Sequence, residues 1–445
     1  MAPKKGSGVM RPDDSAIAHG AALSLPARRS FLRGLAASLA GSAFAAEMPW
    51  LSPLRAAPVG QAPSDRVRLG LIGIGSRGAL LADHLFKTPG VEIAAVCDVH
   101  PSNLARAAAA ADAAGQMARR FTDYRALLDL KGIDGVVIAT PLHLHAPMAL
   151  AAIAAGKHVF CEKSLARTID DCKRVATAAS RSPNVFQIGH QRMFDARFHK
   201  ALSYMRAGEL GPITQIRAYW HRNTDWRRAS ASPELERLVN WRLYREYSAG
   251  LMGELASHHL HVTNWIMDAP PLACVGYGST NYWKDGREVF DNVNVLYRYP
   301  GGVTAIYDSL SSNRHHGMEV QVTGSKGTME LETGRMFWEE LPHAPALTAL
   351  ARQVESGTPA ARVPLASATW SPELKQSATG APILANWEGD DGTGLSLAAY
   401  ANAIRGSERA PGMIDHAYRS GVAALMGLAA MEEGREVAWP GNYPA

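Results

Sequence analysis

The 445-residue sequence has little cysteine, little net charge beyond its first residues, and no long apolar run. The four cysteines, Cys97, Cys161, Cys172 and Cys274, have neither metal-binding nor redox spacing, so we interpret them as small core residues rather than as a disulfide framework. Of the 46 basic and 41 acidic residues, six and two lie in residues 1–46, which leaves 40 and 39 in the remainder. This balance gives no electrostatic reason to expect a nucleic-acid partner.

The first 46 residues have the pattern of a targeting segment. The stretch ARRSFLRG, residues 27–34, precedes an uncharged run of small and apolar residues that ends at Ala46. That run is too short to span a bilayer, and Ala43 and Ala45 have the spacing that signal peptidase prefers. The two arginines followed by Ser-Phe-Leu resemble a twin-arginine signal. We therefore predict that the twin-arginine export machinery carries the folded protein to the periplasm or beyond, without a stable membrane anchor. A disordered basic tail is the alternative.

The remaining pattern predicts two domains after a Pro-, Ala- and Ser-rich linker at residues 47–64. In residues 65–190, apolar strands alternate with amphipathic helices, which is typical of a doubly wound parallel sheet of the Rossmann type. In residues 191–445, longer alternating stretches appear, and YPGG at residues 299–302 is a hairpin signal between two of them. The predicted fold class is α/β: a Rossmann domain followed by an α+β domain with a mostly antiparallel sheet and C-terminal helices.

A glycine-rich turn supplies the strongest single motif for a cofactor. The G-x-G-x-x-G pattern follows a predicted strand and opens a predicted helix, and its residues are Gly73, Gly75, Ser76, Arg77 and Gly78. Such a turn lets backbone N–H groups and a helix N-terminus approach a pyrophosphate. Asp98 ends the second strand, where a carboxylate accepts hydrogen bonds from ribose hydroxyls and favours NAD over NADP, although NADP stays possible. A tight turn without a ligand is the alternative.

Two further motifs resemble those of a known family. ATPLHLH at residues 139–145 and GKHVFCEKSL at residues 156–165 are similar to the TP-x-x-x-H and EKP motifs of the Gfo/Idh/MocA family, named after glucose–fructose oxidoreductase and inositol dehydrogenase. The resemblance extends to GHQRM at residues 189–193 and covers nearly all of the chain after the signal. It implies a large open sheet in the second domain and hydride transfer between NAD(P) and a sugar or cyclitol. Because free NAD should be scarce outside the cytoplasm, we expect the cofactor of an exported protein to be tightly bound. The resemblance also implies cofactor contacts from Thr140, Pro141, His143, His145, Glu162 and Gln191.

The resemblance places Lys163 beside the nicotinamide, where its ammonium group would lower the pKa of the reacting hydroxyl. The sequence departs from the family at Ser164, where proline is usual, but this change removes no reacting group. The family also has an acidic residue four positions before a histidine, and here that pair is Glu254 and His258. We interpret His258 as the base that accepts the hydroxyl proton, with Glu254 orienting it from the same helical face.

The histidine-rich stretch around His258 leaves two alternatives open. Glu254, His258 and His261 have i, i+4 and i+7 spacing, so on an α-helix they would share a face and could form a zinc or iron site. The chemistry of hydride transfer needs no metal, and our prediction includes none. The histidines could also be packed core residues. His259 would point about 100° away from His258 and could border the substrate.

Sugar binding needs planar apolar surface together with hydrogen-bond donors. Trp226 in NTDWRR, and Trp241 and Arg242 in NWRLYRE, offer both, and Arg192 lies close to the last strand of the cofactor domain. Among them, Arg192, Trp241 and Arg242 are our candidates for substrate contact, together with His259.

The sequence supports one leading function and two alternatives. The first is an exported NAD(P)-dependent oxidoreductase acting on a secondary hydroxyl of a sugar or polyol. The second is an NAD-dependent glycosidase that acts by transient oxidation and elimination on a glycoside, although SAGLMGELASHH does not match the GNLYPTHG-like motif of such enzymes. The third is a non-catalytic sugar-binding protein. By resemblance, we expect a homodimer or homotetramer.

Overall fold

The computed structural model describes residues 66–230, 232–339, 380–384, 389 and 391–444. The predicted signal and linker, residues 1–64, lie outside them. Among the described residues, no helix is both long enough and apolar enough to cross a membrane.

The first sheet has six parallel strands in the order β3-β2-β1-β4-β5-β6, which is the Rossmann order. The strands are β1 (Val67–Ile72), β2 (Val91–Cys97), β3 (Arg119–Phe121), β4 (Gly135–Ile138), β5 (His158–Cys161) and β6 (Phe186–Ile188). Most of their residues are buried, as the continuous apolar runs predict for a sheet that is covered on both faces. The strand order reverses between β1 and β4, and this switch point is where open α/β sheets bind ligands.

Helices connect these strands and pack against the sheet. They are α2 (Ser76–Lys87), α3 (Pro101–Ala113), α4 (Tyr124–Leu128), α5 (His145–Ala154) and α6 (Ile169–Ser180). A helix from near the end of the chain, α11 (Thr393–Ile404), packs against α2. Leu397 and Tyr400 of α11 share a core with Leu69 and Leu81, and the Tyr400 hydroxyl donates a 3.1 Å hydrogen bond to the Val136 carbonyl. The cofactor domain is therefore completed by residues distant in sequence.

Among the described residues, the second sheet has nine strands in the order β14-β13-β12-β11-β7-β10-β9-β8-β15, and only β7 and β10 pair in parallel. The strands are β7 (Ile213–His221), β8 (Ala273–Ser279), β9 (Asn292–Arg298), β10 (Thr304–Leu310), β11 (Met318–Gly324), β12 (Gly327–Glu330), β13 (Arg335–Trp338), β14 (Ala381–Pro382) and β15 (Val437–Ala438). β9 and β10 form the predicted hairpin, with Gly301 at φ 75° in the turn. The predicted fold class is confirmed.

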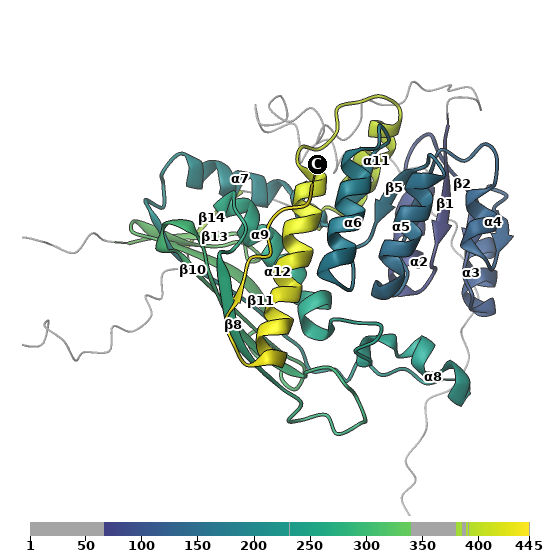
Figure 1. The fold of residues 1–445 in the computed structure, drawn as a ribbon. Helices are drawn as coiled ribbons and strands as arrows, with labels where there is room; N and C mark the ends of the chain where they lie inside the picture. Colours follow the sequence, from purple (N-terminus) through teal and green to yellow (C-terminus); the bar gives the residue numbers. More distant parts are fainter. Residues whose placement is uncertain (1–65, 231, 340–379, 385–388, 390, 445) are drawn as a thin grey trace, which may run out of the picture. The chain divides into compact units, whose positions relative to one another are not determined.

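Helices α7 (Ala196–Arg206), α8 (Pro233–Val239), α9 (Ser257–Met267) and α12 (Met413–Glu433) complete the second part of the chain. Short turns of 3₁₀-helix lie at Leu142–Leu144, Gln191–Phe194 and Trp241–Leu243. Helix α12 packs against α9 and β8 and also against α6 and β6, so it contacts both sheet systems (Figure 1). Gly427 of α12 permits this packing, because a Cβ there would lie 2.3 Å from the Tyr297 hydroxyl oxygen.

Candidate active site

The glycine-rich turn lies at the switch point, between β1 and α2. Gly73 has φ +85°, and a Cβ on Gly78 would lie 2.0 Å from the Gly73 carbonyl oxygen, so glycine is required at both positions. Gly75 differs, because a Cβ there would meet nothing within 4 Å. Packing within the chain therefore does not explain Gly75, whereas the close approach of a ligand's phosphates to the backbone would. The turn thus fits a dinucleotide.

Asp98 fixes the conformation of this turn from the end of β2. One carboxylate oxygen accepts hydrogen bonds from the Ile74 N–H, at 2.7 Å, and from the Asn103 amide, at 3.2 Å. The other accepts a 2.7 Å bond from the His100 N–H. A carboxylate has about four acceptor positions, so the group retains capacity for a ribose hydroxyl beside these bonds.

Thirteen buried side-chain polar atoms lack a hydrogen-bond partner within the described part of the chain; besides the two ring nitrogens of His259, four of them belong to residues predicted to contact the cofactor or the substrate. These four are Thr140 Oγ1, His143 Nδ1, Gln191 Oε1 and Arg192 Nη1. Buried polar groups are nearly always satisfied, so each such atom calls for a ligand or an ordered water. All four belong to residues that the sequence assigned to the cofactor or the substrate. The side chains present therefore fit the predicted ligands.

The side chains of His145 and Glu162, which were predicted to contact the cofactor, instead form hydrogen bonds within the protein. The His145 ring bridges the Ser164 carbonyl, at 2.7 Å from Nδ1, and the Thr140 carbonyl, at 3.0 Å from Nε2. Both of its nitrogens are thus occupied, and His145 ties two loops together. The Glu162 carboxylate accepts a 2.6 Å bond from Arg77 and a 3.1 Å bond from the Lys163 N–H. Direct contact of these side chains with a nucleotide would require these bonds to be exchanged.

Lys163 follows β5 and contacts the second part of the chain; its peptide bond to Ser164 is cis. The Lys163 ammonium group donates a 3.1 Å hydrogen bond to the Glu254 carbonyl and lies 3.9 Å from the Glu254 carboxylate. Arg242 donates to the same carboxylate at 2.7 Å. Burial alone would raise the pKa of Glu254, but Lys163 and Arg242 lower it to about 2. Glu254 is therefore ionised and shared by two cations.

The structure gives Glu254 partners other than His258, and its pairing with His258 stays a prediction. Residues Met252–Ala256 form a π-helical turn before α9, so the regular α-helix assumed from the i, i+4 spacing begins only at Ser257. The Glu254 carboxylate is taken by Lys163 and Arg242, and no described residue forms a hydrogen bond with the His258 ring. Burial, and next the charge of Lys163, hold the pKa of His258 well below its ordinary value. The ring is thus neutral at pH 7.

His259, a predicted substrate contact, and His261, on which the metal alternative depends, are both enclosed by the protein. His259 is fully buried and stacks on Trp220, with ring centroids 5.4 Å apart. His261 is also buried and stacks on His190, with centroids 4.3 Å apart. The described residues contain no group of three or more His, Cys, Asp or Glu side chains placed to hold a metal ion.

A second buried charge network surrounds Trp220, at the end of β7. Arg192 donates a 2.5 Å hydrogen bond to Glu332, and its guanidinium carbon lies 5.5 Å from the Trp220 ring centroid. Burial would raise the pKa of Glu332, but Arg192 and His259 lower it to about 2. The Trp220 ring centroid lies 5.6 Å from that of His258. Arg192 is thus brought to the site, together with a tryptophan and a carboxylate.

The sequence reasoning missed Trp220, Glu332 and His190. Trp220 and Glu332 lie at or beyond strand ends, where the alternating pattern carries no functional signal. His190 stands in the GHQRM stretch that contributed to the family resemblance, so that stretch contained a signal for it. Trp241, a predicted substrate contact, stacks with the Arg242 guanidinium at 4.3 Å. Trp241 therefore packs on Arg242, the residue that forms an ion pair with Glu254.

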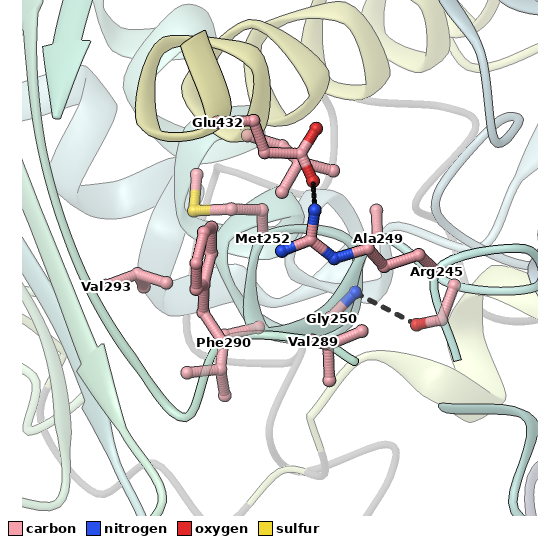
Figure 2. Close-up of a pocket in the computed structure, with 11 residues that line it drawn as sticks. Arg245, Ala249, Gly250, Met252, Val289, Phe290, Val293 and Glu432 are labelled. Carbon is pink, nitrogen blue, oxygen red and sulfur yellow. Dashed lines mark hydrogen bonds and ion pairs between the residues drawn. The ribbon is translucent and has the colours of Figure 1, made fainter. Parts of the chain in front are cut away.

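A small pocket lies behind the π-helical turn (Figure 2). Its walls include Met252, Val289 and Phe290, and Arg245 and Glu432 form a 2.8 Å ion pair beside it. None of the residues predicted to act on cofactor or substrate lines this pocket. We assign it to packing between the turn and α12.

Known proteins share both parts of this chain. Residues 67–190 match the oxidoreductase family with an NAD-binding Rossmann fold, and residues 198–330 match the GFO/IDH/MocA C-terminal domain. Inositol 2-dehydrogenase of Salmonella typhimurium (strain LT2) is 30% identical over 277 residues, covering 60% of this chain and 74% of that protein. A glycosyl hydrolase family 109 protein of Stenotrophomonas maltophilia is 33% identical over 202 residues, covering 44% of this chain and 42% of the relative.

Solved structures share the fold at lower identity. The WlbA dehydrogenase from Bordetella pertussis, in complex with NADH and UDP-GlcNAcA, superposes with a TM-score of 0.64 at 20% identity, over 86% of this chain and 100% of that one. The scyllo-inositol dehydrogenase from Lactobacillus casei, with bound NAD(H) and scyllo-inositol, gives 0.61 at 19% identity, over 84% and 99%.

The buried histidines predict that acid destabilises the protein. Burial lowers the pKa of His416 to about 4, below the value of about 6.5 in an unfolded chain. Between those values the unfolded chain binds a proton that the native state does not, so stability that is full above pH 6.5 is lost as the pH falls toward 4. His416→Gln should reduce the loss of unfolding free energy between pH 7.5 and 5 by about 2 kcal/mol.

Urea titrations at the two pH values measure this difference, with substitution of the exposed His315 to Gln as the control. Glu254 and Glu332, whose pKa values are about 2, lose their contributions mainly below pH 4.5, outside the interval compared. An equal pH dependence for His416→Gln and the wild type would contradict the assignment.

Proposed function

Because the chain belongs to the Gfo/Idh/MocA family of NAD(P)-dependent sugar oxidoreductases, we propose that it transfers hydride between NAD and a secondary carbinol of a sugar or polyol. The observation that carries the proposal is the position of Lys163. Its ammonium group extends from the end of a Rossmann strand to the segment that holds Glu254 and His258. That segment belongs to the second domain, so groups for both cofactor and substrate meet there.

The cofactor would be held by the glycine-rich turn and Asp98, with Thr140, His143 and Gln191 supplying further polar atoms. Bound there, NAD supplies the hydride acceptor. The positive end of α2 favours the pyrophosphate, and the carboxylate of Asp98 would repel a 2′-phosphate. NAD is therefore the preferred cofactor, with NADP as the alternative.

In the proposed mechanism, Lys163 and His258 act on the same hydroxyl oxygen. Removal of hydride from a carbinol carbon requires loss of the hydroxyl proton, and the neutral His258 ring accepts it. The ammonium group of Lys163 stabilises the negative charge that develops on the oxygen. In the reverse direction, protonated His258 returns the proton to the forming hydroxyl. Both groups are largely buried, so their interaction with the substrate is little weakened by solvent.

In this mechanism Glu254 orients Lys163, whereas the sequence predicted that it would orient His258. Its ionised carboxylate lies between Lys163 and Arg242, so it fixes the direction of the lysine side chain and offsets the cost of burying that charge. We therefore propose Glu254 as a positioning residue. Arg192, with its unpartnered Nη1, is the strongest candidate for a further substrate hydroxyl.

Replacement of either reacting side chain should abolish most turnover without releasing the cofactor. We expect Lys163→Ala and His258→Ala each to lower kcat by about 10²-fold or more, which is typical for loss of a general acid–base or electrostatic group. Retained nucleotide is measured by absorbance after denaturation, and turnover by NADH formation with a polyol panel. Lys131→Ala, at an exposed site, is the matched control. Turnover within a few-fold of wild type in both variants would overturn the assignment.

Glycoside cleavage is a second candidate, favoured by the similarity to the family 109 protein. Transient oxidation would use the same Lys163 and His258, but the cofactor would return to its starting state. A panel of p-nitrophenyl glycosides distinguishes the two functions. Net oxidation predicts NADH accumulation with free polyols and no nitrophenol release. Release of nitrophenol without accumulation of NADH would favour the glycosidase.

The outer face of the second sheet supports the predicted homo-oligomer. Val275 and Tyr277 on β8, and Leu296 beside them on β9, project to one face and are 40%, 83% and 42% exposed. Exposed apolar residues that gather on one sheet face are typical of protein–protein contacts. We expect sedimentation analysis to find a dimer or tetramer, and Tyr277→Glu with Leu296→Glu to yield monomers. Tyr282→Glu, in a loop, is the control; a monomeric wild type would contradict the proposal.

Export by the twin-arginine route and tight retention of the cofactor stay predictions. Residues 1–65, which include the predicted signal, lie outside the described part of the chain.

A further inference from the structure

The loop between β7 and α8 carries an arginine that the proposed mechanism does not use. Arg228 Nη2 donates a 2.9 Å hydrogen bond to the Ser76 hydroxyl. Ser76 is the first residue of α2 and belongs to the glycine-rich turn. A side chain of the second domain therefore reaches the predicted phosphate-binding turn of the first.

Among the described residues, Arg228 has no carboxylate partner, whereas four other arginines near the site each have one. Arg77 pairs with Glu162, Arg192 with Glu332, Arg227 with Glu236 and Arg242 with Glu254. Arg228 forms no ion pair with any residue that the structure describes. Partial burial, and next the nearby charge of Arg242, lower the pKa of its guanidinium group, as expected for a cation without a counterion.

The backbone around Arg228 is held in a defined conformation. The buried Asn240 side chain accepts a 2.7 Å bond from the Arg228 N–H and donates a 3.0 Å bond to its carbonyl. Trp226, two residues earlier, has φ 59°, a left-handed conformation that a bulky residue adopts rarely. The Thr224 hydroxyl accepts a hydrogen bond from the Trp226 N–H, and the Asp225 carboxylate accepts one from the Arg227 N–H. These hydrogen bonds thus hold the backbone at Arg228 in one conformation.

We propose that Arg228 is a pyrophosphate ligand supplied by the second domain. The inference rests on the proposed dinucleotide site. Gly75 leaves open space above the turn, and α2 directs its N-terminus there. A guanidinium group has five donors in a fork that matches two phosphate oxygens, and the bond to Ser76 uses only part of this capacity. Release of the nucleotide would then require contacts with both domains to break, which would slow its dissociation.

The test compares nucleotides with and without phosphate groups. We expect Arg228→Ala to weaken binding of NAD and of ADP-ribose about tenfold or more, as for loss of a charge-assisted hydrogen bond, and to leave adenosine binding unchanged. Arg228→Lys, which keeps the charge but not the fork, should fall between Ala and wild type. Calorimetry and competition on nucleotide-stripped protein measure the affinities, and stopped-flow fluorescence measures dissociation of NAD. Arg206→Ala, at the end of α7, removes an equal charge at an exposed site.

Each result has a distinct meaning. A loss confined to NAD and ADP-ribose, with unchanged thermal stability of the nucleotide-free protein, supports the proposal. An equal loss of adenosine binding, or affinities equal to those of Arg206→Ala, overturns it while leaving the proposed function intact. A wild-type protein that binds no dinucleotide would instead overturn the proposed function, and this inference with it.

Discussion

The site depends on one largely buried carboxylate, that of Glu254, held between Lys163 and Arg242. A buried anion is costly unless it is paired, so the presence of Glu254 requires both cations to stay in place. Lys163 comes from the end of β5 and Glu254 from the π-helical turn before α9, so this ion pair connects the parallel sheet to the second domain. The same contact directs the lysine ammonium group to where a hydroxyl would be oxidised.

Burial then determines the protonation state of His258, the proposed base. His258 is surrounded by Lys163, Arg192, His190 and His259, and its low pKa follows from desolvation reinforced by positive charge. A base is useful only in its unprotonated form, and this environment keeps the ring unprotonated at neutral pH. The same burial makes the folded protein less stable in acid, because protonation of the buried histidines lowers the free energy of unfolding.

Much of the fold and part of the site could be predicted from local sequence. The glycine turn was recognisable because strand, turn and helix follow one another directly. Within that short span, Gly73 is required by its positive φ and Gly78 by its close contact with the Gly73 carbonyl. The partners of Glu254 could not be predicted in this way. The i, i+4 spacing suggested His258, but a π-helical turn interrupts the assumed α-helix, and the carboxylate forms ion pairs with Lys163 and Arg242. The roles of Glu332 and α11 likewise depend on tertiary contacts without local signature.

A crystal structure of the protein with NAD bound tests the central claim most directly. The account predicts the pyrophosphate over Gly75 and the nicotinamide ring against Lys163, with its reacting face toward His258 and with Glu254 still between Lys163 and Arg242. A nicotinamide bound elsewhere, or a Lys163 side chain directed away from the ring with Glu254 paired to His258, would contradict it.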